Sequence, residues 1–547
     1  MARVTGSQIL GKCLHQHGID TMFYLMGGPM LGAQQACIDE GMRGIDVRHE
    51  QAAAMMAHAY ARTTNKVGVC MAASGPGVTN LITGMANALH DCAPILAVGG
   101  ASPMNMWGRG VFQEMDQVAL FRPVTKWAER IIDIRRIPDM VATAMRQAQE
   151  GKPGPVYLDI GGDVLYDAID ENEIEYPDPE RARARFRAAA HPDAVRAAIE
   201  LIQSSSKPIA IFGSGVLWSG ASSELNAFVD RFQMPFYPTP QGRGAVPDDH
   251  SLSFPGARST AFREADLLVV VGTRANYINA HLAAPRFSPQ AKLIHVNIDP
   301  MEIGITRSCD LGMVGDVKTV LRQLLDAGAG GVSVEHYSSW IEYLRQVDGK
   351  RQRQMQELMS RDSRPIHPLR LCKEIGEFLN RDAILVVDGQ EILNYGRQSL
   401  QSFQPGHRLN SGPFGTMGVG LPFGIGAKVA HPDKQVLVLH GDGSFGLNAM
   451  ELDTAVRFDI PVVTVISLNG GWTADEAERP KPGRYLGYQR YDKMAEVLGC
   501  HGEYVEDPED IKPALERAFE SGRPAVVNVV TDSTARANTS KFTTYST

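Results

Sequence analysis

Short apolar runs recur along the whole chain and are separated by segments with helical periodicity. Examples are KVGVCMAA (66–73), GPVYLDI (154–160), DLLVVVG (266–272) and QVLVLHGDG (435–443). Strands that are buried on both faces of a parallel sheet read as continuous apolar runs, and the helices between them cover the two faces. The pattern therefore predicts an α/β fold built from doubly wound parallel sheets.

The chain has 547 residues, which is too long for one hydrophobic core. Its apolar runs fall into three blocks, separated by polar or charged segments at 176–193 and 345–365. We expect three doubly wound domains followed by a polar tail, with the outer two domains alike in architecture. The predicted ranges are 1–165, 190–330, 365–530 and 531–547.

Composition excludes several classes of protein. The net charge of -8 gives no electrostatic reason to expect nucleic-acid or membrane binding. The seven cysteines include no C-x-x-C pair, which indicates neither a disulfide framework nor a zinc site. The N-terminus has no apolar region of signal-peptide type, and no stretch is apolar enough for a transmembrane helix. We therefore expect a cytoplasmic protein.

The segment HGDGSFGLNAMELD (440–453) places an aspartate between two glycines where an apolar run ends and a helix begins. Gly441 and Gly443 let the backbone approach a ligand closely, and the carboxylate of Asp442 suits a cation that carries a phosphate. A plain strand-to-helix turn would have the same sequence character, so this motif alone does not decide the function.

A second group of polar and small residues follows the next apolar run, PVVTVISL (461–468). These residues are Asn469, Gly470, Gly471 and Trp472. Because the two strand ends of a βαβ unit lie side by side, Asp442 and Asn469 can offer oxygens to one hard cation. The Gly471 carbonyl and a cofactor diphosphate would complete an oxygen set of the kind that Mg²⁺ prefers.

The spacing of these two groups resembles the fingerprint of thiamin diphosphate enzymes. In that family GDG is followed by a paired Asn-Asn, and here Asn469 comes 27 residues after Asp442. This chain has Leu468 in place of the first asparagine, but the second one binds the metal in the family, so the ligand remains in place. The resemblance covers nearly the whole chain, in the order pyrimidine domain, middle domain and diphosphate domain. It implies thiamin diphosphate and Mg²⁺ as cofactors.

The resemblance assigns catalysis to Glu50, which lies at the junction of a short strand and an Ala-rich helix. In the family this carboxylate protonates the aminopyrimidine ring, which then takes the proton from the reactive thiazolium carbon. A glutamate favoured by the dipole at a helix start is the alternative interpretation. Gly75, Pro76 and Gly77 match the loop that admits the pyrimidine ring from the partner subunit.

Further cofactor contacts are implied by the positions of residues within the family motifs. Met417 stands where the family has an apolar wedge beneath the bent cofactor, although a methionine among glycines is more often core packing. The Gly415 carbonyl would accept from the aminopyrimidine, while Gly389 and Gln390 would hold the diphosphate. The remaining implied contacts are Gly441, Gly443, Ser444 and Trp472.

The resemblance also bears on assembly. Glu50 lies in the first predicted block and Asp442 in the third. Members of the family place these two parts of one cofactor site in facing subunits. A homodimer is therefore the minimum assembly that the resemblance implies, and a homotetramer is favoured.

The segment 110–131 resembles the branch of the family that contains acetolactate synthase, benzaldehyde lyase, oxalyl-CoA decarboxylase and 2-hydroxyacyl-CoA lyase. Phe112 and Gln113 would face the thiazolium, and this Phe-Gln pair is similar to 2-hydroxyacyl-CoA lyases, whereas oxalyl-CoA decarboxylases have Tyr-Glu. Gln113 could orient a substrate carbonyl or hydroxyl, but an amide is a poor proton carrier. Gly28 leaves space where decarboxylases often carry a histidine, which favours carbon–carbon ligation or its reverse.

The middle block offers only a weak glycine signal at 211–220. We expect no FAD there, because the acetolactate synthases that bind it need a longer chain. Arg274, Asp299 and Asp316 occupy positions where related CoA enzymes bind ADP. A degenerate Rossmann-like domain with nothing bound is the alternative.

The polar tail contains Arg536 and Lys541. In CoA-using relatives the C-terminal segment folds over the active site when the thioester binds, so these two residues are candidate contacts to substrate phosphates. A frayed terminus is the default alternative.

The best interpretation of these features is a 2-hydroxyacyl-CoA lyase, which cleaves its substrate to formyl-CoA plus an aldehyde or ketone and catalyses the reverse condensation. The alternative is a benzaldehyde-lyase-like or acetolactate-synthase-like carboligase, or a 2-oxoacid decarboxylase, that does not use CoA. A catalytically silent cofactor-binding subunit is disfavoured, because Glu50 and both metal ligands are present.

Overall fold

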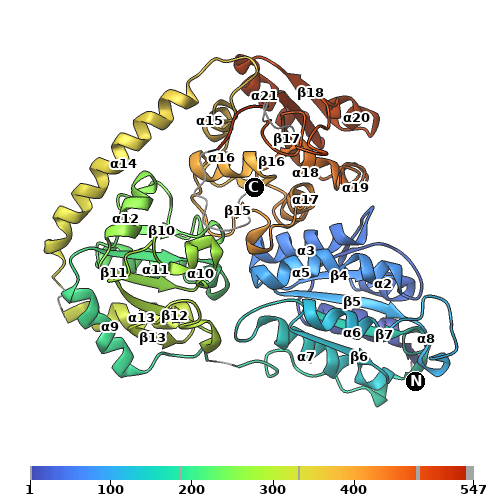
Figure 1. The fold of residues 1–547 in the computed structure, drawn as a ribbon. Coiled ribbons are helices and arrows are strands. Elements are labelled where there is room, and N and C mark those ends of the chain that lie inside the picture. The colour runs from blue at the N-terminus through green and yellow to red at the C-terminus, as the bar shows by residue number, and fades with distance from the viewer. Residues whose placement is uncertain (1–2, 185, 331–332, 476–480, 538–547) are drawn as a thin grey trace.

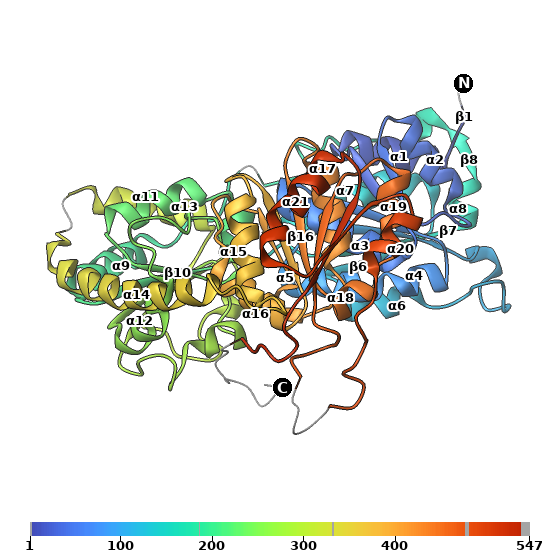
Figure 2. The same cartoon turned by 90° about the horizontal axis from the view of Figure 1, so that it is seen from above.

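The computed structural model describes residues 3–184, 186–330, 333–475 and 481–537, and it contains three parallel sheets covered by helices. Figure 1 shows the third domain (orange to red) above the first (blue to cyan), with the middle domain (green) beside both. Seen from above, the middle domain forms one end of an elongated molecule (Figure 2). The predicted fold class of three doubly wound α/β domains is confirmed. The exact domain boundaries stay a prediction.

The first domain has a six-stranded parallel sheet in the order β3-β2-β4-β5-β7-β6. Its strands are β2 (Thr21–Tyr24), β3 (Arg43–Asp46), β4 (Gly68–Ala72), β5 (Ile95–Ala101), β6 (Trp127–Ile131) and β7 (Val156–Gly161). Its helices are α1 (Gly6–Gln16), α2 (Leu31–Asp39), α3 (Glu50–Thr64), α4 (Pro76–Asn80), α5 (Ile82–Asp91), α6 (Gln117–Phe121), α7 (Ile137–Gln149) and α8 (Gly162–Tyr166). A short antiparallel pair, β1 (Arg3–Thr5) and β8 (Ala168–Asp170), joins the two ends of the domain.

The third domain repeats this strand order as β15-β14-β16-β17-β19-β18. Its strands are β14 (Ile384–Asp388), β15 (Arg408–Leu409), β16 (Val436–Gly441), β17 (Val463–Leu468), β18 (His501–Val505) and β19 (Ala525–Val530). Its helices are α15 (Pro368–Phe378), α16 (Glu391–Ser399), α17 (Gly420–Ala430), α18 (Asp442–Gly446), α19 (Glu451–Arg457), α20 (Tyr491–Val497) and α21 (Ile511–Glu520). The two outer domains therefore share one topology.

The middle domain has a five-stranded parallel sheet in the order β10-β9-β11-β12-β13. Its strands are β9 (Pro208–Phe212), β10 (Phe236–Pro238), β11 (Leu267–Val271), β12 (Lys292–Asn297) and β13 (Leu311–Val314). Its helices are α9 (Pro192–Ser204), α10 (Ser214–Ser219), α11 (Ser222–Arg231), α12 (Arg258–Glu264) and α13 (Val317–Ala327). The three central strands are almost completely buried, as a sheet covered on both faces requires.

The charged segment 345–365, expected to separate two domains, is mostly helical. It forms most of α14 (Ser338–Met359), which runs along the outside of the middle domain toward the third domain (Figure 1). Trp340, Ile341 and Leu344 pack into the middle domain, while most of the later charged residues are exposed. Neither α14 nor any other helix in the described ranges is long and apolar enough to cross a membrane.

Helix α3 of the first domain packs against α17 of the third (Figure 1). A Cβ atom at Gly426 would lie 2.4 Å from the carbonyl oxygen of Met56, so only glycine allows the two helices to approach this closely. Because α3 begins at Glu50 and α17 follows the loop with Met417, this packing fixes the relative positions of two segments that are predicted to contact cofactor.

A buried charge cluster joins all three domains beside this helix contact. Asp91, the last residue of α5, accepts hydrogen bonds from His58 Nε2 at 2.8 Å and from Arg62 Nη1 at 3.0 Å. Gln241 of the middle domain also donates to Asp91, and Gly412 of the third domain lies against it. Burial raises the pKa of Asp91, but Arg62 and His58 outweigh this and hold it below its ordinary value.

Replacing Arg62 by Met should destabilise the protein by about 3–5 kcal/mol, because it leaves the buried Asp91 carboxylate without its guanidinium partner. Urea unfolding followed by tryptophan fluorescence will measure this as a lower midpoint. The matched control is Arg136→Met, which breaks an exposed 2.8 Å ion pair with Asp139 and should leave the midpoint unchanged. Equal midpoints for the two variants would contradict a structural role for the cluster.

Candidate active site

A pocket opens in the third domain where the parallel strands β14, β16 and β17 end at their carboxyl side. It contains about 440 Å³ of empty space, counted together with its open mouth. All of its lining residues lie between 368 and 535. The predicted site residues that it brings together are Gly389, Gln390, Met417, Gly441, Asp442, Gly443, Ser444, Asn469, Gly471 and Trp472.

Asp442 is the first residue of α18 and is 2% exposed. Its Oδ1 accepts a hydrogen bond from the Gly443 N–H at 2.8 Å, while its Oδ2 has no hydrogen-bond partner. Burial raises the pKa of Asp442 to about 6, although the N–H groups of neighbouring glycines oppose the rise. A buried carboxylate oxygen without a partner is costly, and a bound cation would satisfy it.

Asn469 is brought beside Asp442 by the pairing of their strands. In the parallel register of β16 and β17, Gly441 lies opposite Ser467, so both strands end at the same edge of the sheet. The Oδ1 of Asn469 accepts from the Gly471 N–H at 3.2 Å. No cluster of three His, Cys, Asp or Glu residues suited to a metal occurs among the described residues. The candidate ligands for Mg²⁺ are instead the carboxylate of Asp442, the side-chain amide oxygen of Asn469 and the backbone carbonyl of Gly471. A bound diphosphate would supply the remaining oxygens.

Trp472 forms one wall of the pocket. A Cβ atom at Gly443 would lie 2.6 Å from the Trp472 ring, so the glycine of the GDG motif is needed for close packing as well as for ligand access. The Trp472 N–H donates to the Arg484 carbonyl at 3.0 Å. The guanidinium of Arg484 lies behind the same loop.

The end of β14 supplies the residues predicted to hold the diphosphate. Gly389 and Gln390 precede α16, whose first N–H groups can bind an anion. Asp388 accepts from the Gly420 N–H at 2.9 Å and so holds the start of α17 beside this turn. Burial raises the pKa of Asp388 to about 6, with several backbone N–H groups opposing the rise.

The loop before α17 exposes the two residues predicted to contact the rings of the cofactor. Met417 is 39% exposed and lines the pocket, so core packing does not explain it. Gly415 is also exposed and has a φ of 76°, a conformation that favours glycine. Gly415 is not among the lining residues of the pocket.

Glu50 is the first residue of α3 and is 7% exposed. Its Oε2 accepts a hydrogen bond from Asn80 Nδ2 at 2.9 Å. A Cβ atom at Gly77 would lie 3.3 Å from Oε1, so the loop of Gly75, Pro76 and Gly77 approaches the carboxylate closely. Glu50 does not line the pocket of its own chain.

Gln113 lies against the same loop. It has a φ of 59°, unusual for a residue with a side chain, and its Oε1 accepts from Ser74 Oγ at 2.5 Å. Gly75 has no Cβ, and an added one would lie 2.8 Å from the Gln113 Cβ. The neighbouring Phe112 is 85% exposed, and a Cβ atom at Gly28 would have no other atom within 4 Å. The first domain therefore presents these residues at its surface.

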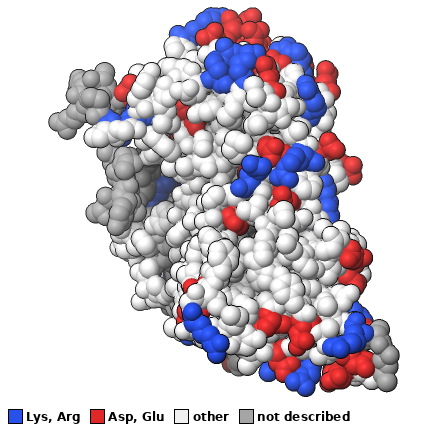
Figure 3. Space-filling view, turned by 90° about the vertical axis from the view of Figure 1, so that its right-hand side faces the viewer, with Lys and Arg blue, Asp and Glu red and all other residues white. Residues whose placement is uncertain are grey.

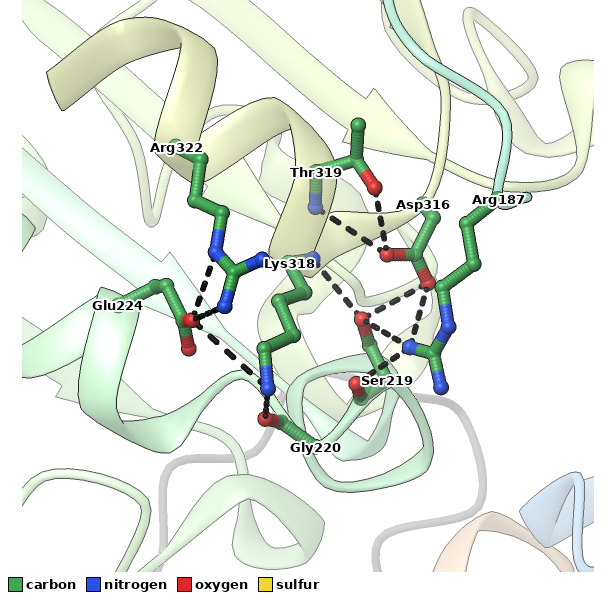
Figure 4. Close-up of polar contacts among 8 residues, drawn as sticks. All are labelled: Arg187, Ser219, Gly220, Glu224, Asp316, Lys318, Thr319 and Arg322. Atoms are coloured by element: carbon green, nitrogen blue, oxygen red, sulfur yellow. Dashed lines mark hydrogen bonds and ion pairs between the residues drawn. The ribbon is translucent and has the colours of Figure 1, made fainter. Parts of the chain in front are cut away.

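The residues predicted to bind ADP are held by contacts within the chain. Asp316 Oδ2 accepts from Ser219 Oγ at 2.8 Å and from Arg187 at 3.1 Å, while Oδ1 accepts from the Thr319 N–H at 3.2 Å (Figure 4). Asp316 thus acts as the N-cap of α13. These contacts account for Asp316 without a nucleotide.

Asp299 and Arg274 connect the middle domain to the first domain. Lys152 Nζ donates to Asp299 at 3.2 Å, and the Arg274 guanidinium donates to the carbonyl of His90. Asp299 also accepts from a backbone N–H as the cap of a short 3₁₀ helix. ADP binding at these residues stays a prediction.

The start of the C-terminal tail closes one side of the pocket. Thr531, Asp532 and Ala535 line it, and the Ala537 N–H donates to a carboxylate oxygen of Glu391 at 3.1 Å. Arg536 is exposed beside these residues. Lys541 lies outside the described residues.

Three buried residues support the site without having been predicted. Gln117 accepts from the Gly75 N–H at 2.7 Å, and Glu451 accepts from the N–H groups of Arg48 and His49, both at 3.1 Å. Arg484 donates to carbonyls on both sides of Gly471. No local pattern marks these side chains, because their partners lie elsewhere in the fold.

Comparison with known families agrees with this arrangement. Residues 4–120 match the N-terminal thiamine pyrophosphate binding domain, residues 195–324 the central domain and residues 393–529 the C-terminal thiamine pyrophosphate binding domain of the thiamine pyrophosphate enzymes. The chain belongs to this family. Thiamine pyrophosphate, after which the family is named, is the same compound as thiamin diphosphate. The predicted family is confirmed.

Individual proteins of known name show which members of the family this chain resembles. The chain is 33% identical to a 2-hydroxyacyl-CoA lyase from Arabidopsis thaliana, covering 98% of this chain and 97% of that protein. It is 34% identical to an acetolactate synthase large subunit from Mycobacterium tuberculosis, covering 96% and 95%. It is 31% identical to 2-hydroxyacyl-CoA lyase 1 from Homo sapiens, covering 99% and 96%. This protein is a thiamin diphosphate-dependent enzyme of the 2-hydroxyacyl-CoA lyase and acetolactate synthase group.

Glu451 should make stability depend on pH. Burial raises the pKa of its carboxyl from 4.5 to about 7, so the folded protein binds a proton that the unfolded chain releases. The stabilisation is complete below about pH 4.5 and is lost as the pH rises through 7, by up to roughly 3 kcal/mol. The urea midpoint of the original protein should therefore fall, relative to that of the Glu451→Gln variant, as the pH rises from 4.5 to 8. A difference between the two midpoints that does not change with pH would contradict a raised pKa for Glu451.

Proposed function

We propose that this enzyme cleaves 2-hydroxyacyl-CoA to formyl-CoA plus an aldehyde or ketone, and that it catalyses the reverse ligation with thiamin diphosphate and Mg²⁺. The observation that supports a CoA thioester is a group of arginines between the middle and third domains. Guanidinium groups bind phosphates tightly, often with two parallel hydrogen bonds. CoA carries several phosphate groups, whereas a simple 2-oxoacid carries one carboxylate.

Four arginines, Arg243, Arg258, Arg397 and Arg408, lie around the C-terminal end of α16. Arg243 and Arg408 donate to carbonyls near the end of this helix, at 2.9 Å in each case. Such bonds satisfy carbonyls that a helix end leaves unpaired, so these two arginines have a structural role.

Arg258 and Arg397 are different, because the Nε of each has no hydrogen-bond partner. Within the described ranges, no carboxylate forms an ion pair with either of them. Burial lowers the pKa of Arg258 to about 10, and the neighbouring Arg286 and Arg397 add to this effect. Placing several guanidinium groups close together in a partly buried region is unfavourable unless an anion balances their charge.

The position of Arg397 relates this group to the pocket. Helix α16 begins at Glu391, which lines the pocket, and Arg397 lies in its last turn. At 1.5 Å per residue, the two are about 9 Å apart along the helix axis. The pantetheine arm of CoA is long enough to join a reacting thioester in the pocket to phosphates held by Arg258 and Arg397.

The residues of this chain have separate tasks in the proposed reaction. Bound thiamin diphosphate supplies an acidic thiazolium carbon that adds to carbonyl carbons and accepts the electron pair of the broken bond. Glu50 would hold a proton at the pyrimidine ring, and Gln113 would orient the substrate carbonyl or hydroxyl. Asp442 and Asn469 would hold Mg²⁺ together with the Gly471 carbonyl. The walls of the acceptor space would be Trp472, Met417 and Phe112.

A second copy of this chain is part of the proposal, because Glu50 does not line the pocket of its own chain. The first and third domains both expose large apolar side chains: Met26 (61%), Leu31 (46%), Leu447 (47%) and Met450 (49%). The face that these domains present in Figure 3 has broad areas without charged residues. Such surfaces suit a homodimer, and a dimer of dimers would give the proposed homotetramer.

A carboligase without CoA is the second candidate, because acetolactate synthases are as similar to this chain as the lyases are. Incubation with formyl-CoA and either acetone or benzaldehyde, followed by mass spectrometry, should yield a 2-hydroxyacyl thioester. Pyruvate alone should give little acetolactate. Formation of acetolactate without any thioester product would favour the second candidate.

Replacing Glu50 by Gln should lower kcat by about 10²–10⁴, since the ring nitrogen would lose its proton donor. Binding of thiamin diphosphate, followed by quenching of tryptophan fluorescence, should persist because the diphosphate residues are intact. Replacing the partly exposed Glu40, which follows α2, by Gln is the control and should leave kcat unchanged. Full turnover by the Glu50 variant with every donor would show that the catalytic assignment is wrong.

Replacing Arg258 by Met should raise KM for the CoA thioester about 10–100-fold, the effect of losing a charge-assisted hydrogen bond of about 1.5–3 kcal/mol. Steady-state kinetics with formyl-CoA will measure this. The matched control is Arg381→Met, which breaks an exposed 2.6 Å ion pair with Asp249 across the same two domains. If both variants keep the KM of the original protein, the arginine group does not bind the thioester.

A further inference from the structure

A buried arginine encloses the loop that carries two of the proposed metal ligands. Arg484 is 7% exposed, and its guanidinium makes three hydrogen bonds to backbone carbonyls. Its Nη2 donates to Asn469 at 3.1 Å, its Nη1 to Gly470 at 3.3 Å and its Nε to Thr473 at 2.8 Å. One side chain thus ties together both ends of the turn that leaves β17.

The backbone of Arg484 contacts the same turn. Its carbonyl accepts from the Trp472 N–H at 3.0 Å, and a Cβ atom at Gly471 would lie 2.4 Å from that carbonyl oxygen. Residues 469–473 are therefore held by Arg484 through its side chain and its main chain. Tyr485, which follows Arg484, also lies against residues 469–473, which we call the metal loop, and forms an antiparallel bridge with Gly471.

The charge of Arg484 has no ordinary partner. Among the residues that the structure describes, no carboxylate forms an ion pair with it, yet its side chain is nearly buried. Its positive charge acts electrostatically on the carboxylate of Asp442. A structural clamp for carbonyls does not by itself require an ionised group, because a neutral donor could satisfy some of them at lower desolvation cost. The guanidinium offers a planar fork that no other side chain reproduces.

We propose that Arg484 is the positioning residue of the metal loop, which directs the Asn469 amide and the Gly471 carbonyl toward the Mg²⁺ site. The proposal rests on the proposed role of Asp442 and Asn469 as metal ligands. Residues that orient metal ligands change metal affinity by about 10–100-fold when they are replaced. Arg484 touches neither substrate nor cofactor in this role and acts only through the backbone of the loop.

The proposal is tested by metal binding rather than by activity alone. Arg484→Lys keeps the charge but cannot reach three carbonyls with one nitrogen, and Arg484→Met removes charge and donors. Binding of Mn²⁺ in the presence of thiamin diphosphate, measured from the loss of the free-ion electron paramagnetic resonance signal, should weaken about 10–100-fold in both variants. Activity should recover largely at saturating Mg²⁺.

The matched control is Arg490→Lys, in the same segment, where the arginine forms a 2.6 Å pair with Asp492 and its side chain is half exposed. This control should bind Mn²⁺ like the original protein. Unchanged Mn²⁺ affinity in both Arg484 variants would overturn the proposal. So would weak binding in the Met variant alone, which would show that a single donor is sufficient and that the planar fork of the guanidinium is not needed.

Two further results would also overturn it. If both Arg484 variants unfold at much lower urea concentration even with cofactor and Mg²⁺ saturating, Arg484 supports the fold in general. If turnover stays low at saturating Mg²⁺ with cofactor bound, Arg484 acts in the reaction itself. Failure of the original protein to bind Mn²⁺ with thiamin diphosphate is a separate outcome, because it would contradict the proposed metal site itself.

Discussion

The side-by-side ends of β16 and β17 are the constraint on which the candidate active site depends. Parallel strands end at one edge of a sheet, and the register of this pair places Gly441 opposite Ser467. Asp442 and Asn469 must then emerge as neighbours, although they are far apart in the chain. A carboxylate with one unpartnered oxygen results, and that oxygen is costly unless a cation binds it. The candidate pocket therefore depends first on the sheet topology, which places the ends of two strands together, and only then on any single residue.

The duplicated topology of the outer domains gives the two halves of the site separate supports. The third domain holds the proposed metal and diphosphate residues in one pocket, while Glu50 and Gln113 lie on the first domain. Within one chain these domains are joined by α3 and α17 and by the buried Asp91 cluster. Because these contacts join the two domains, a symmetric second chain would bring the first domain of one copy to the pocket of the other, as the proposed dimer requires.

Strand positions and the residues at strand ends could be predicted from the sequence, because each depends on local pattern. The apolar run before Asp442 and the Ala-rich helix after Glu50 are examples. Gln117, Glu451 and Arg484 could not be predicted, since their partners lie elsewhere in the fold or on the far side of an insert. The helical character of 345–365 was also missed, because its charged residues cover an exposed helix face as readily as a linker.

The choice of substrate depends on groups that the thiamin motifs do not contain. The proposed metal and diphosphate residues belong to the motifs by which the chain resembles the family as a whole, so they cannot distinguish a 2-oxoacid from a CoA thioester. In our proposal Arg258 and Arg397 do distinguish them, because neither has a carboxylate partner among the described residues and the Nε of each lacks a hydrogen bond, so a phosphate would be favourable there. A small 2-oxoacid held at the pocket would reach neither arginine if its carboxylate stays beside the reacting carbon. A ligand whose phosphates extend beyond the end of α16 would reach both, and this difference in length is the physical basis for preferring CoA.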